Sequence, residues 1–142
     1  MKVTRMAGHL IRRLHQKSTQ VFASKLQQEG LDLTPVQFSA MDAIRSVPGL
    51  DQAQIATLIA YDRATIGGVI DRLEKKGLVV RTVSTTDRRA REVRLTEAGH
   101  ELFQKALPVV RNLQNDILDG LDDVSRGVFL KLIETALRED KA

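Results

Sequence analysis

A helix followed at once by a β-hairpin is the clearest pattern along the chain. Within residues 62–76 the apolar positions recur at i, i+3, i+4 and i+7, which is the spacing of one face of an α-helix. Asp62 can cap the start of this helix, and Gly77 is placed to end it. A β-branched run at 78–83 and an alternating segment at 91–95 then predict two strands joined by a polar turn. The apolar stripe of the helix consists of Ile66, Val69, Ile70 and Leu73.

Two shorter helices are predicted before this unit. Residues 34–37 form a capping box with proline at the first helical position, so a helix begins there and runs to about residue 47. Asp51 and Gln54 form a second capping box, which begins a short helix. The tight connection from that helix to the one beginning near Asp62 has the spacing of a helix-turn-helix, in which the first helix braces the second across the DNA backbone.

Long apolar stripes on both flanks predict three further helices. The first covers about residues 4–28, and the second begins at Thr96, runs for some 25 residues and should bend or break at Pro108. The last helix ends the chain. Their apolar faces are wider than one small lobe can cover, which predicts burial against a second chain. The apolar residues of the last helix are Val128, Phe129, Leu132, Ile133, Ala136 and Leu137.

These elements predict one mainly helical domain over residues 1–142, with about six helices and a small β-hairpin wing. A winged helix-turn-helix lobe would occupy about 34–97, and dimerisation helices about 4–29 and 97–140. The chain has no cysteine, which excludes a disulfide framework and thiolate metal ligands. It also has no apolar run of membrane-spanning length and no secretory signal, so we expect a cytoplasmic protein with no membrane partner.

The charge pattern points to a polyanionic partner. The net charge is +4, and the basic residues concentrate in the first 30 residues and in 62–96. Residues 81–94 carry five arginines against Asp87 and Glu92, and two of the arginines stand at a turn, where guanidinium groups are unusual. The alternative is a merely solvated hairpin whose charged edge blocks strand pairing.

If the helix after Asp62 enters the major groove, its residues off the apolar stripe can approach bases or phosphates, with Lys75 on the backbone. Arg88 at the wing tip is the candidate for the minor groove, where narrow A·T-rich stretches attract arginine. For Arg72, a surface ion pair with Asp71 or Glu74 is the alternative. The candidate DNA-binding residues are Arg63, Thr65, Gly67, Gly68, Arg72, Lys75, Arg88, Arg89 and Arg91.

Six motifs in sequence order resemble the multiple-antibiotic-resistance regulator (MarR) family of bacterial winged-helix transcription factors. They include Asp87-Arg88-Arg89-Ala90 and Leu95-Thr96-Glu97-Ala98-Gly99, and the likeness covers about residues 31–103. The resemblance implies a homodimer whose two lobes read a pseudo-palindrome in double-stranded DNA, and an Asp87–Arg89 pair that shapes the wing. The six motifs lie at 34–38, 50–56, 62–66, 71–79, 87–90 and 95–99.

One pair of residues departs from the family pattern. Where the family commonly has Thr-Arg, this chain has Gly67-Gly68, and each glycine costs about 1 kcal/mol of helix stability relative to alanine. Close approach of the helix backbone to DNA would explain both glycines. Sequence discrimination would then rest on Arg63, Thr65, the wing and DNA shape.

The resemblance also implies an effector, because family members are often released from DNA by small aromatic acids. A carboxylate or phenolate could be held by His9, Arg13 and His15, with Phe38 and Met41 as apolar walls. Less specific likenesses point to a branch that regulates nicotinate and other aromatic-acid degradation. The alternative is a dimer without any ligand, in which these cations are ordinary solvated side chains.

We therefore expect a sequence-specific transcriptional regulator, a repressor released by an aromatic acid. The alternative is a sequence-tolerant architectural DNA-binding protein, which the two glycines and the arginine-rich wing would suit. An enzyme is not expected, since three dispersed histidines and no nucleophile motif leave no catalytic constellation to assign. No cofactor is expected, and a zinc site would need ligands beyond His9, His15 and His100.

Overall fold

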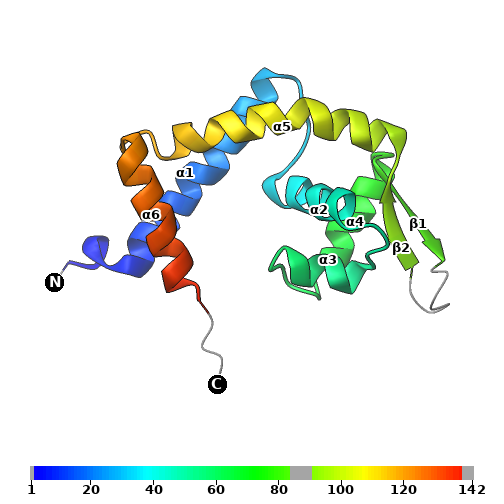
Figure 1. The fold of residues 1–142 in the computed structure, drawn as a ribbon, viewed down its shortest axis with the longest axis horizontal. Helices are drawn as coiled ribbons and strands as arrows, with labels where there is room; N and C mark the ends of the chain where they lie inside the picture. The colour runs from blue at the N-terminus through cyan, green and yellow to red at the C-terminus, as the bar shows by residue number, and fades with distance from the viewer. Residues whose placement is uncertain (1, 84–90, 139–142) are drawn as a thin grey trace.

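The structure is a computed structural model that describes residues 2–83 and 91–138 (Figure 1). It is mainly helical with one two-stranded antiparallel sheet, which confirms the predicted fold class. The elements are a 3-10 turn Val3–Arg5, α1 Ala7–Gln28, α2 Pro35–Ser46, α3 Gln52–Leu58, α4 Ile66–Lys75, β1 Val79–Val83, β2 Arg91–Leu95, α5 Glu97–Ile117 and α6 Asp123–Ala136.

Two regions are joined by the long helix α5. Figure 1 shows α2, α3, α4 and the hairpin gathered into a lobe below one end of α5. The amino-terminal half of α1 and the whole of α6 lie toward the other end. The carboxy-terminal half of α1 packs along α5 and contributes Phe22 and Leu26 to the core.

The core of the lobe is closed by aromatic side chains from three helices. Phe38 of α2 stacks on Phe103 of α5, with ring centroids 4.9 Å apart, and Phe22 of α1 meets Phe38 edge-on at 6.4 Å. The guanidinium of Arg45 covers the other side of Phe103, 4.7 Å from the ring centroid. These contacts fix the lobe against α1 and α5.

Local capping signals in the sequence were mostly accurate. Both capping boxes form, with Thr34 accepting a hydrogen bond from the Gln37 amide and Asp51 from the Gln54 amide. The expected cap at Asp62 was wrong, because α4 begins only at Ile66. The Asp62 carboxylate instead accepts from the Ala64 amide at 3.0 Å and so caps the turn that precedes α4.

The flanking helices differ from the prediction in two places. The first α-helix begins at Ala7, because a 3-10 turn and an extended Met6 precede it. The break expected at Pro108 does not occur, since α5 is continuous through it. Ala106 and Val110, on either side of the proline, are buried in the core, and this packing offsets the hydrogen bond that proline cannot donate.

The apolar surface of α6 is not covered within the chain. None of its residues is buried, and Val124 is 78% and Leu132 62% exposed. The amino-terminal half of α1 is similar, with Ile11 67% exposed. No helix among the described residues is long and apolar enough to cross a membrane.

Candidate nucleic-acid interface

Helix α4 has one buried face and one exposed face, as its sequence predicts. The stripe Ile66, Val69, Ile70 and Leu73 is no more than 4% exposed. On the opposite side, Gly68, Arg72 and Lys75 are exposed, and Arg63 and Thr65 are exposed in the turn and cap that precede the helix. Four of the predicted major-groove residues, Arg63, Thr65, Gly68 and Arg72, are thus accessible in the chain.

The two adjacent glycines of α4 have different surroundings. A Cβ atom on Gly67 would lie 3.1 Å from the amide nitrogen of Gln52 in α3, which is closer than ordinary packing. A Cβ on Gly68 would meet nothing within 4 Å. Contact with α3 therefore accounts for Gly67 without any DNA, whereas only Gly68 is left open on the exposed side.

Arg81 occupies a position that sequence analysis did not foresee. It is one of the five arginines of the hairpin, although not one of the candidate DNA-binding residues, and its side chain is only 17% exposed. It pairs with Asp71 at 2.7 Å and with Glu74 at 3.2 Å, both on α4. It also donates a hydrogen bond to Gln52 in α3 at 3.1 Å.

The arrangement around Arg81 also bears on Arg72. A surface ion pair between Arg72 and either Asp71 or Glu74 was the alternative to a DNA contact. In the structure both carboxylates pair with Arg81 instead. Arg72 stays exposed on the outer side of α4.

The wing is an antiparallel hairpin attached to the lobe along both strands. The two predicted strands form, and in their register Val79 pairs with Leu95 and Val83 with Arg91. On the inner side, the Val93 amide donates to the Leu50 carbonyl at 2.9 Å. Arg91 is exposed at the start of β2. The candidates Asp87, Arg88 and Arg89 lie outside the described residues.

The carboxy-terminal end of α4 is clamped to the beginning of α5. Thr96 donates its amide to the Leu78 carbonyl at 3.0 Å and its hydroxyl to the Gly77 carbonyl at 2.6 Å. A Cβ on Gly99 would lie 2.1 Å from that same Leu78 oxygen, so only glycine allows this approach. The junction joins the helix-turn-helix directly to the long helix.

A second contact ties the same end of α4 to α2. The Lys76 ammonium donates to the Asp32 carbonyl at 2.9 Å and to the Gln37 side-chain oxygen at 3.1 Å. Gln37 is the one polar residue buried among those the structure describes, and it also completes the α2 capping box. Burial of an amide with its partners satisfied makes this a specific contact.

Comparison with known proteins agrees with this architecture. The sequence profile of the MarR family matches residues 31–90. The chain is 33% identical over 141 residues to the HTH-type transcriptional repressor NicR of Pseudomonas putida, covering 98% of this chain and 87% of NicR. The protein belongs to the MarR family of transcriptional regulators. The resemblance inferred from the motifs is confirmed.

Two solved MarR-family structures resemble the whole chain. BpsR of Bordetella bronchiseptica, whose DNA binding is regulated by 6-hydroxynicotinic acid, is 26% identical with a TM-score of 0.90, covering 99% of each chain. The repressor CouR, solved on a 23-mer DNA duplex, is 29% identical with a TM-score of 0.86, covering 96% of this chain and 95% of CouR. In both comparisons the matched part of this MarR-family chain includes the lobe and the flanking helices.

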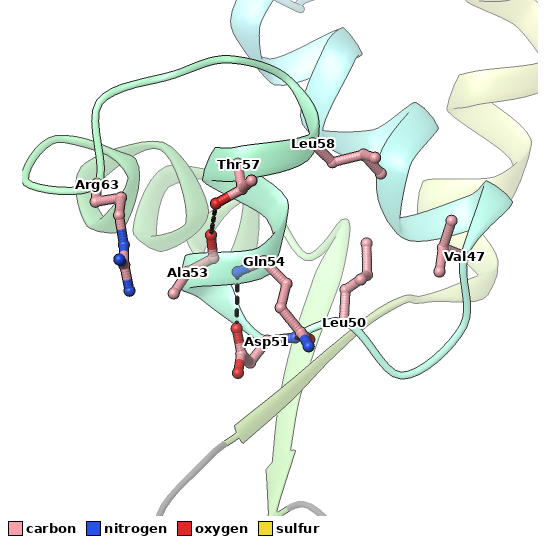
Figure 2. Close-up of a pocket in the computed structure, with 8 residues that line it drawn as sticks. All are labelled: Val47, Leu50, Asp51, Ala53, Gln54, Thr57, Leu58 and Arg63. Carbon is pink, nitrogen blue, oxygen red and sulfur yellow. Dashed lines mark hydrogen bonds between the residues drawn. The ribbon is translucent and has the colours of Figure 1, made fainter. Parts of the chain in front are cut away.

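A groove with a volume of about 580 Å³ lies beside α3 on the lobe of this MarR-family protein (Figure 2). Figure 2 shows Arg63 reaching along one side of it from the turn that precedes α4. Its floor is fixed by the Asp51 cap and by a hydrogen bond from the Thr57 hydroxyl to the Ala53 carbonyl at 3.2 Å. The lining residues are Val47, Leu50, Asp51, Ala53, Gln54, Thr57, Leu58 and Arg63.

The predicted effector residues are not gathered into one pocket within the chain. His9, Arg13 and His15 are on the amino-terminal half of α1, and the His9 ring lies 3.3 Å from Arg12. Phe38 lines a second cavity of about 280 Å³ between α2 and the end of α3. Met41 is fully buried in the core of this chain.

Among the described residues, no three His, Asp or Glu side chains are grouped as metal ligands would be. Of the three histidines, His9 and His15 are on α1 and His100 is on α5. The exposed chemistry of the lobe is instead cationic and hydrogen-bonding, which suits phosphates and base edges.

Proposed function

We propose that this MarR-family protein is a homodimeric repressor that binds a pseudo-palindromic operator through α4 and the wing. The observation that carries the proposal is the exposed outer side of α4 with Arg72, which the exposed Arg63 and Thr65 precede and a hairpin follows. The second strand of that hairpin begins at the exposed Arg91. Guanidinium and hydroxyl groups on one side of a helix can bind base edges in the major groove. CouR, a relative in sequence and fold, has been solved on a DNA duplex.

The wing would supply the second part of DNA reading. In this proposal Arg88 enters the minor groove, Arg89 and Asp87 pair to shape the wing, and Arg91 binds the phosphate backbone. Lys75 at the end of α4 would bind phosphate as well. Arginine in a narrow minor groove adds sequence preference through DNA shape.

Dimerisation would use the helices outside the lobe. Val3, Leu10 and Ile11 at one end of the chain and Val128 and Leu132 in α6 are each about half to two-thirds exposed. Such surface is unusual for a monomer and typical of an interface that a second copy covers. Two lobes held by one symmetric interface would then read two half-sites.

We further propose that a small aromatic acid releases the protein from DNA. The support is indirect: the relative BpsR is regulated by 6-hydroxynicotinic acid, and this chain carries His9, Arg13 and His15 on one helix. Cations of this kind bind carboxylates or phenolates through charge-assisted hydrogen bonds. Phe38, which lines a cavity of the lobe, is the aromatic candidate for the same site.

The experiment that tests operator binding is a titration of the purified protein against its own upstream intergenic DNA and a scrambled duplex at fixed salt. A regulator should prefer the operator by about a thousandfold or more. Equal affinity for both duplexes would favour the architectural alternative, for which the open Gly68 is the specific support. That alternative binds DNA by backbone contacts and deformation.

The same titration, repeated with 6-hydroxynicotinate and benzoate, tests the effector. Loss of operator binding with either acid supports release by an aromatic acid. Arg13→Ala should abolish the response to the acid while leaving DNA affinity in its absence unchanged. Lys25→Ala is the matched control, because Lys25 is a cation on the same helix that pairs with Asp116 at 3.8 Å. Unchanged DNA affinity across both acids would refute the effector.

A further inference from the structure

Arg81 is the point at which three elements of the lobe meet. It lies in β1, and its guanidinium bonds to Gln52 of α3 and to Asp71 and Glu74 of α4. The arginine side chain is 17% exposed, while those of Asp71 and Glu74 are 68% and 44% exposed. We call this set of four residues the Arg81 brace.

The brace runs along one flank of the recognition helix. Gly67, Asp71 and Glu74 are spaced i, i+4 and i+7 on α4 and so fall on the same side of the helix. That side lies between the buried stripe and the outer face that carries Arg72. A Cβ on Gly67 would lie 3.1 Å from the side-chain nitrogen Nε2 of Gln52 and would crowd it. One arrangement therefore explains both the pairing of Arg81 and the glycine at 67.

The charges of the brace make Arg81 a poor phosphate ligand. Its guanidinium already binds two carboxylates, so a DNA phosphate would have to displace one of them. Among the described residues, Arg81 is the cation that pairs with Asp71 and Glu74, so without its charge both would lose that partner beside Arg72 and Lys75. Arg81 thus does two things for the surface: it joins the wing to α4, and it neutralises acidic groups near the DNA-facing residues.

We propose that Arg81 is a positioning residue for DNA specificity, which fixes the wing at one angle to α4 so that both contact their grooves at once. The inference rests on the proposed operator binding. An arginine with a planar guanidinium suits this role because it can bond to three side chains in fixed directions. Exposed ion pairs alone add little stability, so the main effect should be on specificity and not on folding.

The test compares operator and scrambled DNA across a salt series for the wild type, Arg81→Gln, and the double variant Asp71→Asn/Glu74→Gln. The double variant separates the two roles of Arg81, which are to neutralise the nearby carboxylates and to hold the wing against α4. It removes two negative charges near DNA, so simple electrostatics predicts tighter binding to both duplexes and an unchanged ratio. The brace predicts that the ratio of operator to scrambled affinity falls by about tenfold or more, the cost of a lost base contact.

A reversed pair adds a rescue. In Arg81→Glu/Glu74→Arg the two charges exchange places, and the brace predicts that most of the specificity lost in Arg81→Glu returns. If Arg81 instead contacted a phosphate directly, the reversed pair would not restore specificity. In that case Arg81→Gln should also lower the slope of log affinity against log salt concentration by about one for both duplexes. Asp116→Asn is the control for loss of a carboxylate in an exposed pair outside the lobe.

The outcomes separate this inference from the function on which it rests. A wild type that does not prefer its operator overturns the proposed function and this inference with it. A wild type that discriminates, together with a double carboxylate variant that discriminates equally well, overturns the brace alone. If Arg81→Gln fails to fold in a thermal melt, the carboxylate variants still decide, because they leave the arginine in place.

Discussion

The lobe and the flanking helices differ in how far their apolar residues are buried. Every buried apolar residue among those described lies between Phe22 and Leu113, and these side chains close a core within one chain. Inside that span single apolar residues are also exposed, such as Leu58 at 55%, and outside it exposed large apolar residues run along both flanks, from Val3 at 65% to Leu137 at 74%. The lobe is complete by itself, whereas the flanks carry surface that only another molecule can cover.

This difference assigns the two regions to two tasks. A closed core keeps the reading helix and the wing rigid, since packed interiors resist small displacements. The open flanks supply the surface for assembly. The two regions meet where Thr96 and Gly99 of α5 hold the backbone of Gly77 and Leu78. This junction and the aromatic contacts of Phe22, Phe38 and Phe103 connect the flanks to the lobe.

The largest effect is expected where the flanks are uncovered. Val128→Asp/Leu132→Asp places charges on α6, where both wild-type residues are more than half exposed in the single chain. Burying an unpaired carboxylate in an apolar interface costs several kcal/mol, and each substitution occurs twice in a symmetric dimer. We expect a monomer at concentrations where the wild type is a dimer, as measured by sedimentation equilibrium.

Leu58→Asp is the matched control for this prediction, because Leu58 is an apolar residue of the lobe with similar exposure, 55%. It should leave the dimer intact. If both variants stay dimeric, α6 is not the interface. If both become monomers, the distinction between a closed lobe and open flanks is itself mistaken.

The junction between the regions should be the next most sensitive place. Gly99→Ala would put a methyl group 2.1 Å from the Leu78 carbonyl oxygen, and backbone on both sides would have to move. We expect a loss of about 3 kcal/mol in the free energy of unfolding, at the upper end for overpacking. Denaturant unfolding at fixed protein concentration measures it.

Gly120→Ala is the control for Gly99, since a Cβ at Gly120 would meet nothing within 4 Å. Its stability should be unchanged or slightly higher, because alanine restricts the unfolded chain. Equal stabilities for the two alanine variants would mean that the contact between α5 and Leu78 can relax freely.

The sequence predicted what is local and missed what is assembled from distant segments. The capping boxes at Thr34 and Asp51 and the stripe on α4 depend on residues within one or two turns, so their spacing was sufficient. The partners of Arg81 lie seven to 29 residues away in two other elements, and no spacing rule brings them together. From the sequence alone, Arg81 therefore had no role beyond the basic charge of the hairpin.

Two other errors have the same origin. Asp62 was read as the cap of α4, but only the tertiary structure shows a separate turn at 62–65 before the helix. Met41 was offered as a pocket wall, yet it faces the core from α2. Composition and helical spacing do not distinguish the buried apolar side of α2 from a side that lines a cavity. Only the packing of α1 and α5 against α2 decides this.

A moderate effect is expected at the glycines of α4, which test how the closed lobe meets DNA. Gly68→Ala has open space, so it should stabilise the free protein by about 1 kcal/mol through helix propensity. If the α4 backbone approaches DNA closely at this point, the same change should weaken operator binding. Thermal melts and operator titrations of one preparation measure both.

Gly67→Ala serves as the partner variant. Its methyl group would press on the side-chain amide of Gln52, which offsets the stability gained from the higher helix propensity of alanine. The net gain in stability should therefore be smaller than for Gly68→Ala. Higher stability without weaker operator binding in Gly68→Ala would show that the backbone at this position stays away from the duplex.

The smallest effect is expected at the surface pair that joins α1 to the segment after α5. Lys17 donates a hydrogen bond to Asp119 at 2.6 Å and holds the pKa of that carboxyl below its ordinary value of 3.8. Because the folded-state pKa is the lower one, the pair stabilises the protein above that value, and the contribution is lost as the pH falls through the folded-state pKa. The side chains of Lys17 and Asp119 are 43% and 68% exposed, so solvent screens the pair and the gain is small.

Asp119→Asn should therefore lower the melting temperature slightly at neutral pH, and the difference from the wild type should shrink as the pH falls below about 4, where the ordinary carboxyl is protonated. Asp116→Asn is the control, because Asp116 is 3.8 Å from Lys25 and so too far for a hydrogen bond. A difference that stays constant with pH would mean that the wild-type side chain contributes through packing and not through its charge. The Lys17–Asp119 ion pair would then contribute no stability to the flanking helices, and their stabilisation would come from contacts with a second copy of the chain.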